Sequence, residues 1–438
     1  MANTSHTIEF DFSQFTFTAE QIRDINELVY EGIMKLPEIA EIHQLWPNII
    51  YDKEVGFITG GGLVGKAGQG CDPTPQDWAI NTRKVLWQPK SWEVFLSECA
   101  KDLEATMVVY AMNRGTRVDD LTDTDFMAIV VEVLTGAIYK AMYRIIWLND
   151  TDANDVDFEE VPTAAVSEQT AGQAISGTVY EGVTATTAGA VKCAKSDKTV
   201  VYLAGTAATG TASADKTYYT KDTDNKTEIN DGGTYTHDID TDYFNIIDGL
   251  FKQLRAAVTA DSNLGVTIAA NSQNSKANQM SYMTPERAYT LLSDMWYKAP
   301  IKLRQMKNDA NEANRPRFLV TQSIADAYEQ YLLGKGISET YVNLIDGVKA
   351  LSFLGVPVIA MPIWDEMIQS YQDLRDTYFK PHRAVLTSKS VLAVGFGSNS
   401  LYGGFDIWYD KTSRKNYMLV KDKIDAKLAN PAHLIYAE

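Results

Sequence analysis

The segment from Phe126 to Leu148 most constrains the fold, because it is apolar enough to span a membrane yet carries three charged residues. At roughly 100° per residue, Glu132, Lys140 and Arg144 fall within an arc of about 120° and form one polar stripe. Such a stripe is costly against lipid. The segment therefore predicts an amphipathic helix over 122–148, about 40 Å long, that packs against other parts of the protein.

The chain of 438 residues is acidic, with 40 basic and 57 acidic residues and a net charge of −17. Proteins that read nucleic-acid sequence usually carry a basic footprint, and anionic membranes repel an acidic surface, so composition disfavours both classes. The length is sufficient for two or three cores. Cys71, Cys99 and Cys193 are far apart and odd in number, which favours neither a disulfide framework nor a zinc site.

The first 45 residues predict an arm followed by a helix. Residues 1–18 are polar and aromatic without a period, which is typical of an extended arm, and they contain no secretory signal pattern. Residues 19–36 place five apolar side chains on one helical face, after a capping-box pattern formed by Thr18 and Gln21. Pro37 stands where this helix must end.

Residues 48–87 predict a long extended hairpin, because the stretches 49–51 and 83–87 have strand composition. The tip between them is too rich in glycine to hold a helix or to build a core. We therefore expect the hairpin to lie on another subunit and its tip to take part in assembly. The candidate tip residues are Gly60, Gly61, Gly62, Gly65, Lys66, Gly68 and Gly70.

Composition changes sharply between residues 151 and 240. This window holds 17 Thr, 14 Ala and 8 Gly, with 15 acidic and 6 basic residues, a net of −9. Short runs of strand-forming residues alternate there with turn signals. The window therefore predicts a small, surface-mounted, β-rich inserted domain that carries about half of the net charge of the protein.

The rest of the chain mixes helices and strands, so the fold class is α+β with an insertion. We expect helices at 93–112 (one or two), 242–258, 284–299 and 323–333, a strand at 318–320, a kinked buried strand at 353–360, and four or five strands with glycine turns from 383 to the end.

Two stretches approach known binding motifs without completing them. Residues 60–67 come within one residue of a phosphate-binding P-loop, but Ala67 replaces the hydroxyl residue that would bind Mg²⁺. Residues 150–161 begin like an EF-hand calcium loop, but Asp155 stands at its glycine position and Val161 at its glutamate position. Loose cation binding by this acidic loop stays open, beside its interpretation as a solvated linker.

No catalytic constellation is readable in the sequence. The five histidines are scattered, and none has metalloprotease spacing or stands beside a nucleophile motif. Carboxylate pairs are uninformative in so acidic a chain. We therefore predict no enzyme activity, no cofactor and no metal site.

The order of these elements resembles the major capsid proteins of tailed bacteriophages, which share the Hong Kong 97 (HK97) fold with herpesvirus capsid floors and encapsulin shells. The hairpin at 48–87 is similar to the E-loop of that family, and the helix at 122–148 is similar to its spine helix. Several segments also resemble phages of gut Bacteroidetes, including the crAss-like group. Further similarity lies at 242–253, at 316–321, in the strand at 354–358 and at 383–395.

The resemblance implies a structural protein that self-assembles, as hexamers and pentamers, into the icosahedral head enclosing double-stranded DNA. It implies assembly in the host cytoplasm, residence in the virion and no membrane. Implied partners are the portal, scaffold and head-decoration or auxiliary proteins, with non-specific contact to DNA. The implied domains are an N-terminal arm and helix (1–45), an E-loop (46–88), a P-domain (89–154), the inserted domain (155–240), an A-domain (241–400) and closing P-domain strands (401–438).

Two alternatives stay open at this point. An encapsulin-type nanocompartment shell has the same fold, although encapsulins are usually shorter and lack a large insertion. A surface adhesin or binding module could be built on the Thr/Ala-rich window, but the chain shows no secretory signal.

Overall fold

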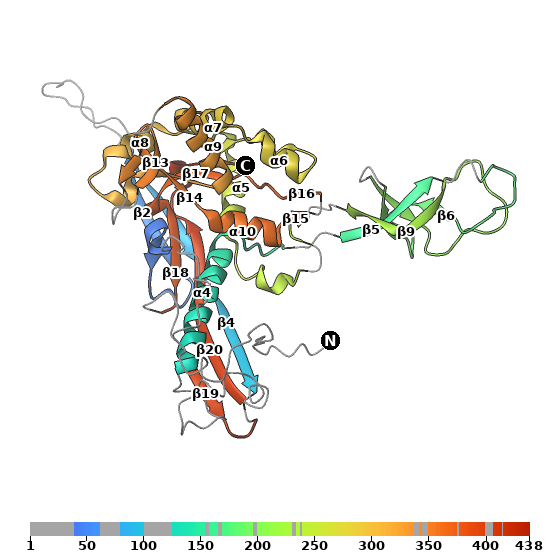
Figure 1. Cartoon of the computed structure of the whole chain (residues 1–438), viewed down its shortest axis with the longest axis horizontal. Helices are drawn as coiled ribbons and strands as arrows, with labels where there is room; N and C mark the ends of the chain where they lie inside the picture. Colours follow the sequence, from blue (N-terminus) through green and yellow to red (C-terminus); the bar gives the residue numbers. More distant parts are fainter. Residues whose placement is uncertain are drawn as a thin grey trace, which may run out of the picture.

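In the computed structural model, the described residues are 39–61, 79–99, 125–153, 157–164, 169–195, 199–229, 234–236, 239–336, 341–343, 349–374, 376–398, 406–413 and 415–438. They contain both helices and sheets, so the expected α+β class is confirmed. The predicted arm at 1–18 and helix at 19–36 lie outside these residues. Figure 1 shows a larger body, an elongated sheet with a long helix, and a smaller sheet that projects from the body.

A seven-stranded mixed sheet forms the centre of the larger body. Its alternate residues face two different cores: Phe318 and Val320 belong to one, and Leu319 to the other. Helices therefore cover both faces, which explains why β17 and β21 are buried along their whole length. The strand order is β10 (Gly265–Val266), β21 (Leu434–Ala437), β17 (Ala384–Ser388), β11 (Pro316–Val320), β14 (Val356–Ala360), β13 (Lys349–Phe353) and β12 (Tyr341–Asn343).

The helices of this body flank the sheet. Residues of α7 and α9 pack on one face, and residues of α5 and α10 on the other. The α-helices are α5 (Leu250–Ala260), α6 (Lys276–Tyr282), α7 (Pro285–Lys298), α8 (Ile301–Gln305), α9 (Gln322–Gly334) and α10 (Pro362–Tyr371). The described residues also form short 3-10 helices: η3 (Thr241–Tyr243), η4 (Ser262–Leu264), η5 (Ala269–Ser272), η6 (Met306–Asn308), η7 (Glu312–Asn314), η9 (Lys389–Val391) and η10 (Pro431–His433). A separate two-stranded sheet consists of β15 (Asp373–Leu374) and β16 (Thr377–Tyr378).

A second, elongated sheet carries the long helix, α4 (Asp125–Trp147), along one face (Figure 1). The predicted helix over 122–148 is thereby confirmed across the described part. None of the helices in the described part of the chain has the length and apolarity needed to cross a membrane. The strand order is β1 (Gln44–Trp46), β18 (Leu392–Phe396), β20 (Lys415–Leu428) and β19 (Asp406–Asp410), with β4 (Lys90–Cys99) along the other edge of β20.

The hairpin predicted at 48–87 forms from β2 (Lys53–Gly61) and β3 (Ala79–Trp87). Its ladder runs from the pair Lys53 and Trp87 to the pair Gly61 and Ala79. Among the described residues neither strand pairs with any other strand. The prediction of a strand at 49–51 is wrong, because these residues precede β2 and Ile49 instead packs into a small cluster at the hairpin base.

The inserted window contains a separate five-stranded sheet, as its composition predicts. Its strand order is β5 (Asp157–Ala164), β9 (Tyr218–Ile229), β6 (Tyr180–Val183), β8 (Val200–Leu203) and β7 (Val191–Ala194). Two small clusters, around Val179 and around Cys193, give it cores of its own. It projects from the body in Figure 1.

Three local predictions are wrong for identifiable reasons. Residues 93–99 belong to strand β4, because alternate side chains from Trp92 onward face α4, whereas 100–112 lie outside the described residues. The helix expected at 242–258 begins only at Leu250. The strand expected at 353–360 is a tight hairpin: Leu354 and Gly355 have positive φ and join β13 to β14. The helices at 284–299 and 323–333 and the five closing strands are confirmed.

The base of the β2–β3 hairpin supplies the first test. A Cβ atom on Gly395 would lie 2.9 Å from the Trp87 ring, whereas one on Gly56 would meet nothing within 4 Å. Gly395→Val should therefore displace the buried Trp87 and lower the free energy of unfolding by about 1–3 kcal/mol. Urea unfolding measures this, with Gly56→Ala as the control. Equal stability of both variants would contradict this account of the hairpin base.

Candidate functional site

The seven glycine and lysine residues predicted at the hairpin tip divide into two groups. Gly60 and Gly61 lie in β2, opposite Ile80 and Ala79 of β3, so the stretch that resembled a P-loop starts as a paired strand. Gly62, Gly65, Lys66, Gly68 and Gly70 lie outside the described residues. Their role in assembly stays a prediction.

The hairpin is fixed to the body at its base. Trp87 is buried against Ile49, Ala393 and Ala429. Next to it, the Gln88 backbone N–H donates to the buried Asp425 carboxylate at 2.7 Å, and Lys427 lies 3.4 Å from the same carboxylate. Burial raises the pKa of Asp425, although Lys427 and the Gln88 N–H partly offset the effect.

Beyond Trp87, several of the described side chains of the hairpin are exposed. Lys84 and Glu54 form a solvent-exposed ion pair across the two strands at 2.7 Å. Ile80 and Leu86 of β3 are 59% and 40% exposed, which is unusual for strand residues in a folded body. An apolar two-stranded ribbon without a covering layer is marginally stable by itself. It therefore presents surface that another element can cover.

A stack of aromatic rings lies on the face of the elongated sheet opposite α4. The Phe95 and Tyr417 ring centroids are 5.5 Å apart and nearly parallel, and those of Tyr417 and Trp408 are also 5.5 Å apart. Phe95 is 49% exposed and Trp408 is 36% exposed. We name Phe95, Tyr417 and Trp408, from β4, β20 and β19, the aromatic ladder.

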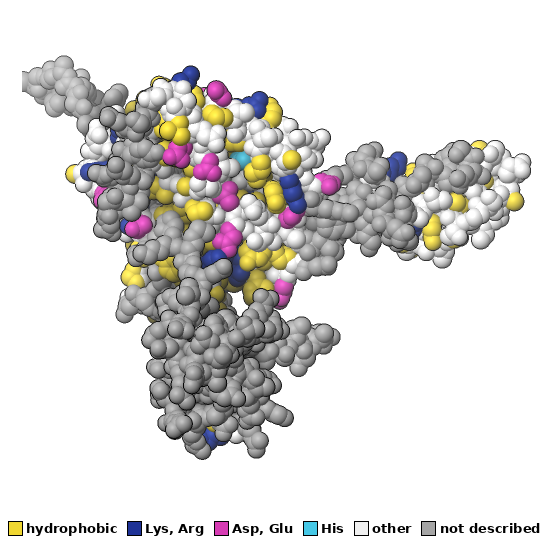
Figure 2. Space-filling model, viewed as in Figure 1, with side chains coloured by type: hydrophobic (Ala, Val, Ile, Leu, Met, Phe, Trp, Pro, Cys, Tyr) yellow, Lys and Arg dark blue, Asp and Glu magenta, His cyan; other side chains and the backbone are white. Residues whose placement is uncertain are grey.

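Other exposed apolar side chains lie on the larger body. Tyr297, Ile301 and Leu333, from α7, α8 and α9, are each more than 60% exposed. Tyr289 stacks on Tyr331 with ring centroids 4.5 Å apart. On the face drawn in Figure 2, hydrophobic side chains are scattered among acidic and basic ones over this body.

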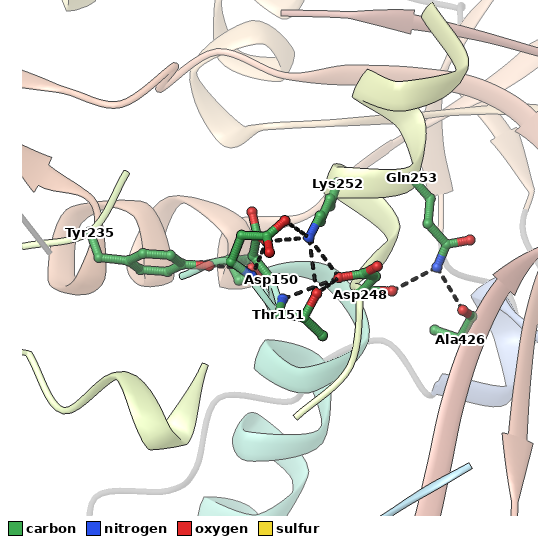
Figure 3. A network of polar contacts seen from close by, with 9 residues as sticks. Asp150, Thr151, Tyr235, Asp248, Lys252, Gln253 and Ala426 are labelled. Carbon is green, nitrogen blue, oxygen red and sulfur yellow. Dashed lines mark hydrogen bonds and ion pairs between the residues drawn. The ribbon is translucent and has the colours of Figure 1, made fainter. Parts of the chain in front are cut away.

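A polar cluster, which we name the joint, lies where α4, the insertion and α5 meet (Figure 3). The Lys252 ammonium contacts carboxylate oxygens of Asp150 at 2.6 Å, Asp152 at 2.7 Å and Asp248 at 2.8 Å. The Thr151 backbone N–H and hydroxyl both donate to Asp248. One side chain of α5 thereby binds the start of the insertion to the end of α4.

The electrostatics of the joint favour its charged form. Burial opposes ionisation, but the three carboxylates outweigh it and raise the pKa of Lys252. Likewise, hydrogen bonds from Lys252 and Thr151 outweigh burial and lower the pKa of Asp248. In the acidic loop that begins like a calcium site, Asp150 and Asp152 thus direct their carboxylates at an ammonium group. The described residues contain no cluster suited to a metal ion.

The other end of the insertion is held at the same place. The Tyr235 hydroxyl donates to the Leu148 carbonyl at 2.6 Å, and the Tyr235 ring packs on Phe244. The Thr236 backbone N–H donates to the Tyr371 carbonyl at the end of α10. Both chain segments leading to the insertion are therefore bound to the body.

The joint is also bound to the elongated sheet. The Gln253 amide donates to the carbonyls of Asp248 and Ala426, at 2.7 and 2.6 Å, and accepts from the Leu428 N–H. At the start of α5, Gly249 lies directly against the end of α4, because a Cβ on it would be 2.8 Å from the Asn149 carbonyl oxygen. This contact also explains why the helix expected from 242 begins only at Leu250.

Sequence reasoning missed the joint and the aromatic ladder. Asp150 and Lys252 are 102 positions apart, and Phe95 and Tyr417 are further apart still, so no local pattern links them. Two signals were available. Trp408 and Tyr417 stand on consecutive strands, and the acidic cluster at 150–155 immediately follows the long helix.

No protein-family model and no curated protein matches this chain. Solved structures match over nearly its whole length. The capsid of Myoviridae phage XM1 is 7% identical with a TM-score of 0.43, covering 98% of both chains. The capsid of cyanophage P-SCSP1u is 8% identical with a TM-score of 0.43, covering 97% of this chain and 98% of that one.

An encapsulin is also similar. The holo-SrpI encapsulin complex from Synechococcus elongatus is 9% identical with a TM-score of 0.39, covering 93% of this chain and 92% of that one. The chain is thus similar to capsid and encapsulin shell proteins.

Removing the ammonium group of the joint supplies a second test. Lys252→Met should lower the free energy of unfolding by about 2 kcal/mol near pH 7, because it leaves three carboxylates close together without a cation. The lowered pKa of Asp248 means that this stabilisation exists above pH 4 and is lost as the pH falls further.

The difference between wild type and Lys252→Met should therefore shrink as the pH falls below about 4, as chemical denaturation across pH measures. Lys140→Met is the matched control. It removes a partly exposed pair with Glu366 and should cost at most about 1 kcal/mol. A pH-independent penalty for Lys252→Met would contradict the electrostatic account of the joint.

Proposed function

We propose that this chain is the major capsid protein of a tailed phage, a structural subunit that self-assembles into the icosahedral head around double-stranded DNA. The observation that carries the proposal is the β2–β3 hairpin, which is anchored at Trp87 and otherwise presents apolar side chains to solvent. A ribbon of this kind becomes stable when a neighbouring copy covers it.

The aromatic ladder is the surface that we propose receives this hairpin. Both elements are apolar, both are half exposed in the isolated chain, and they lie on different parts of it. A contact between unlike surfaces of identical copies is heterologous, and such contacts generate closed rings when the rotation closes. Many weak contacts of this type add up to a stable shell through avidity.

The proposal assigns roles to the remaining parts. Residues 46–88 act as the E-loop, 89–154 with 401–438 as the P-domain, and 241–400 as the A-domain, whose exposed Tyr297, Ile301 and Leu333 meet other copies around the local axes. The glycine-rich tip with Lys66 takes part in contacts between copies. Portal, scaffold and decoration proteins are the expected partners, and assembly takes place in the host cytoplasm before the subunit becomes part of the virion.

Electron microscopy of the expressed full-length chain tests the proposal. Closed shells or capsomers are expected, either from the chain alone or after a scaffold protein is added. The contents separate the proposed function from an encapsulin-type shell, since packaged DNA supports the former and a bound enzyme cargo supports the latter. Monomers under all of these conditions would contradict both.

Variants of the exposed apolar residues test the mechanism. Ile80→Lys and Phe95→Lys should leave the fold intact, because both side chains are about half exposed, but should reduce shell yield at least tenfold by placing a charge in the contact. Thr178→Lys, on the exposed surface of the insertion, is the charge-matched control. Normal shells from both variants would exclude these two surfaces from assembly.

Deleting the insertion tests whether it holds copies together or decorates the shell. Its described residues expose no large apolar side chain, so we propose that it is an ornament. Replacing 157–229 by a short Gly/Ser linker keeps Asp150, Lys252 and Tyr235 of the joint and should leave shell yield and heat resistance unchanged. A loss of shells by a variant that folds normally would identify the insertion as a bridge.

A further inference from the structure

The first described residues of the chain, 39–43, form a short segment that is buried against α4. We name this segment the seat. It consists of α1 (Ile39–Ile42) and His43, and three of its side chains, those of Ile39, Ile42 and His43, are essentially inaccessible to solvent. The Ile39 backbone N–H donates to the Tyr139 hydroxyl at 2.8 Å. The seat is therefore the first part of the described chain that is bound to α4.

His43 holds this segment as a neutral ring. Its Nδ1–H donates to the Ile39 carbonyl at 3.0 Å, which fixes the tautomer, and its Nε2 atom is buried with no hydrogen-bond partner. Its ring lies 5.5 Å from that of Trp147 and 6.3 Å from that of Tyr143, measured between centroids. A second proton would therefore add a buried N–H that has no acceptor.

The surrounding charges also oppose protonation. Lys389 of η9 and Arg317 of β11 are the charged groups that act on the ring, and α4 contributes the neutral phenols of Tyr139 and Tyr143. Arg317 is tied to the seat itself, because its guanidinium donates to the Glu41 carbonyl. Glu41, the carboxylate of the seat, points to solvent. Burial first, and then these two cations, lower the pKa of His43 to about 4.

We propose that His43 is a proton-sensitive latch that keeps the seat packed on α4 at neutral pH and releases it on acidification. The proposal concerns the single chain and does not depend on shell assembly. Because α1 has four residues and one face in the core, expulsion of the charged ring removes Ile39 and Ile42 from their contacts as well.

The sign and size of the effect follow from linkage. A histidine with a lowered pKa in the bound state destabilises that state as the pH falls below its unperturbed value of about 6.5, until the bound-state pKa is reached. The difference between about 6.5 and about 4 corresponds to a roughly 300-fold shift in the equilibrium between bound and released seat. The latch is therefore closed at pH 7 and weakened progressively below pH 6.

Two measurements test the latch. Histidine labelled with ¹³C at Cε1 gives at most five NMR signals, and His43→Gln identifies the signal of His43. This signal should stay neutral at pH 6 and titrate between about pH 4 and 5. In parallel, amide exchange at His43, whose N–H donates to the Ile39 carbonyl, should be slow at pH 7 and accelerate, after correction for intrinsic rates, near pH 4.5.

His43→Phe keeps a ring in the core but has no titrating group, so the amides of its seat should still exchange slowly at pH 4.5. The control His433→Gln should show the same amide exchange as wild type. Release of the seat in His43→Phe at the wild-type pH would overturn the proposal. Amide exchange of the wild-type seat that stays slow down to pH 3.5 would also overturn it. If His43→Phe does not fold at pH 7, a wild-type His43 signal that titrates near 6.5 would overturn it.

Discussion

The packing around Trp147, at the last turn of α4, is the interaction on which the rest of the structure depends. Its ring meets those of His43 from the seat, Phe251 from α5 and Trp364 from α10, with centroids 4.6 to 5.5 Å apart. Aromatic contacts of this kind bury large apolar areas and restrict geometry. One side chain thus packs the long helix against both the larger body and the seat. The joint begins three residues further along the chain, at Asp150.

Local patterns predicted the elements, and long-range contacts decided their ends. The helix at 122–148 and the helix after Thr284 were predicted because their apolar periodicity and cap are local. The segment 242–249 has the same periodicity and buries Phe244 and Ile247, yet it is irregular because Gly249 must approach the backbone of Asn149. Burial was predictable there, whereas backbone conformation was not.

The β2–β3 hairpin and the aromatic ladder also show that local patterns do not predict long-range contacts. The hairpin could be predicted from glycine content and strand composition, because an exposed ribbon is a local property. The aromatic ladder required the pairing of β4 and β19 with β20, which no sequence spacing specifies. The helix expected at 93–112 failed for this reason: the alternation from Trp92 to Leu96 is a strand pattern whose partner stands more than 300 residues later.

The joint has a consequence for how the chain accepts foreign sequence. The two chain segments that flank the inserted sheet, at Asp150–Asp152 and at Tyr235–Thr236, are bound to neighbouring parts of the same body by contacts that involve no residue of that sheet. These contacts therefore form an attachment site that does not depend on which domain is inserted. A small domain whose termini lie close together meets the same two attachment points, so it can replace the natural one without removing a contact of the joint.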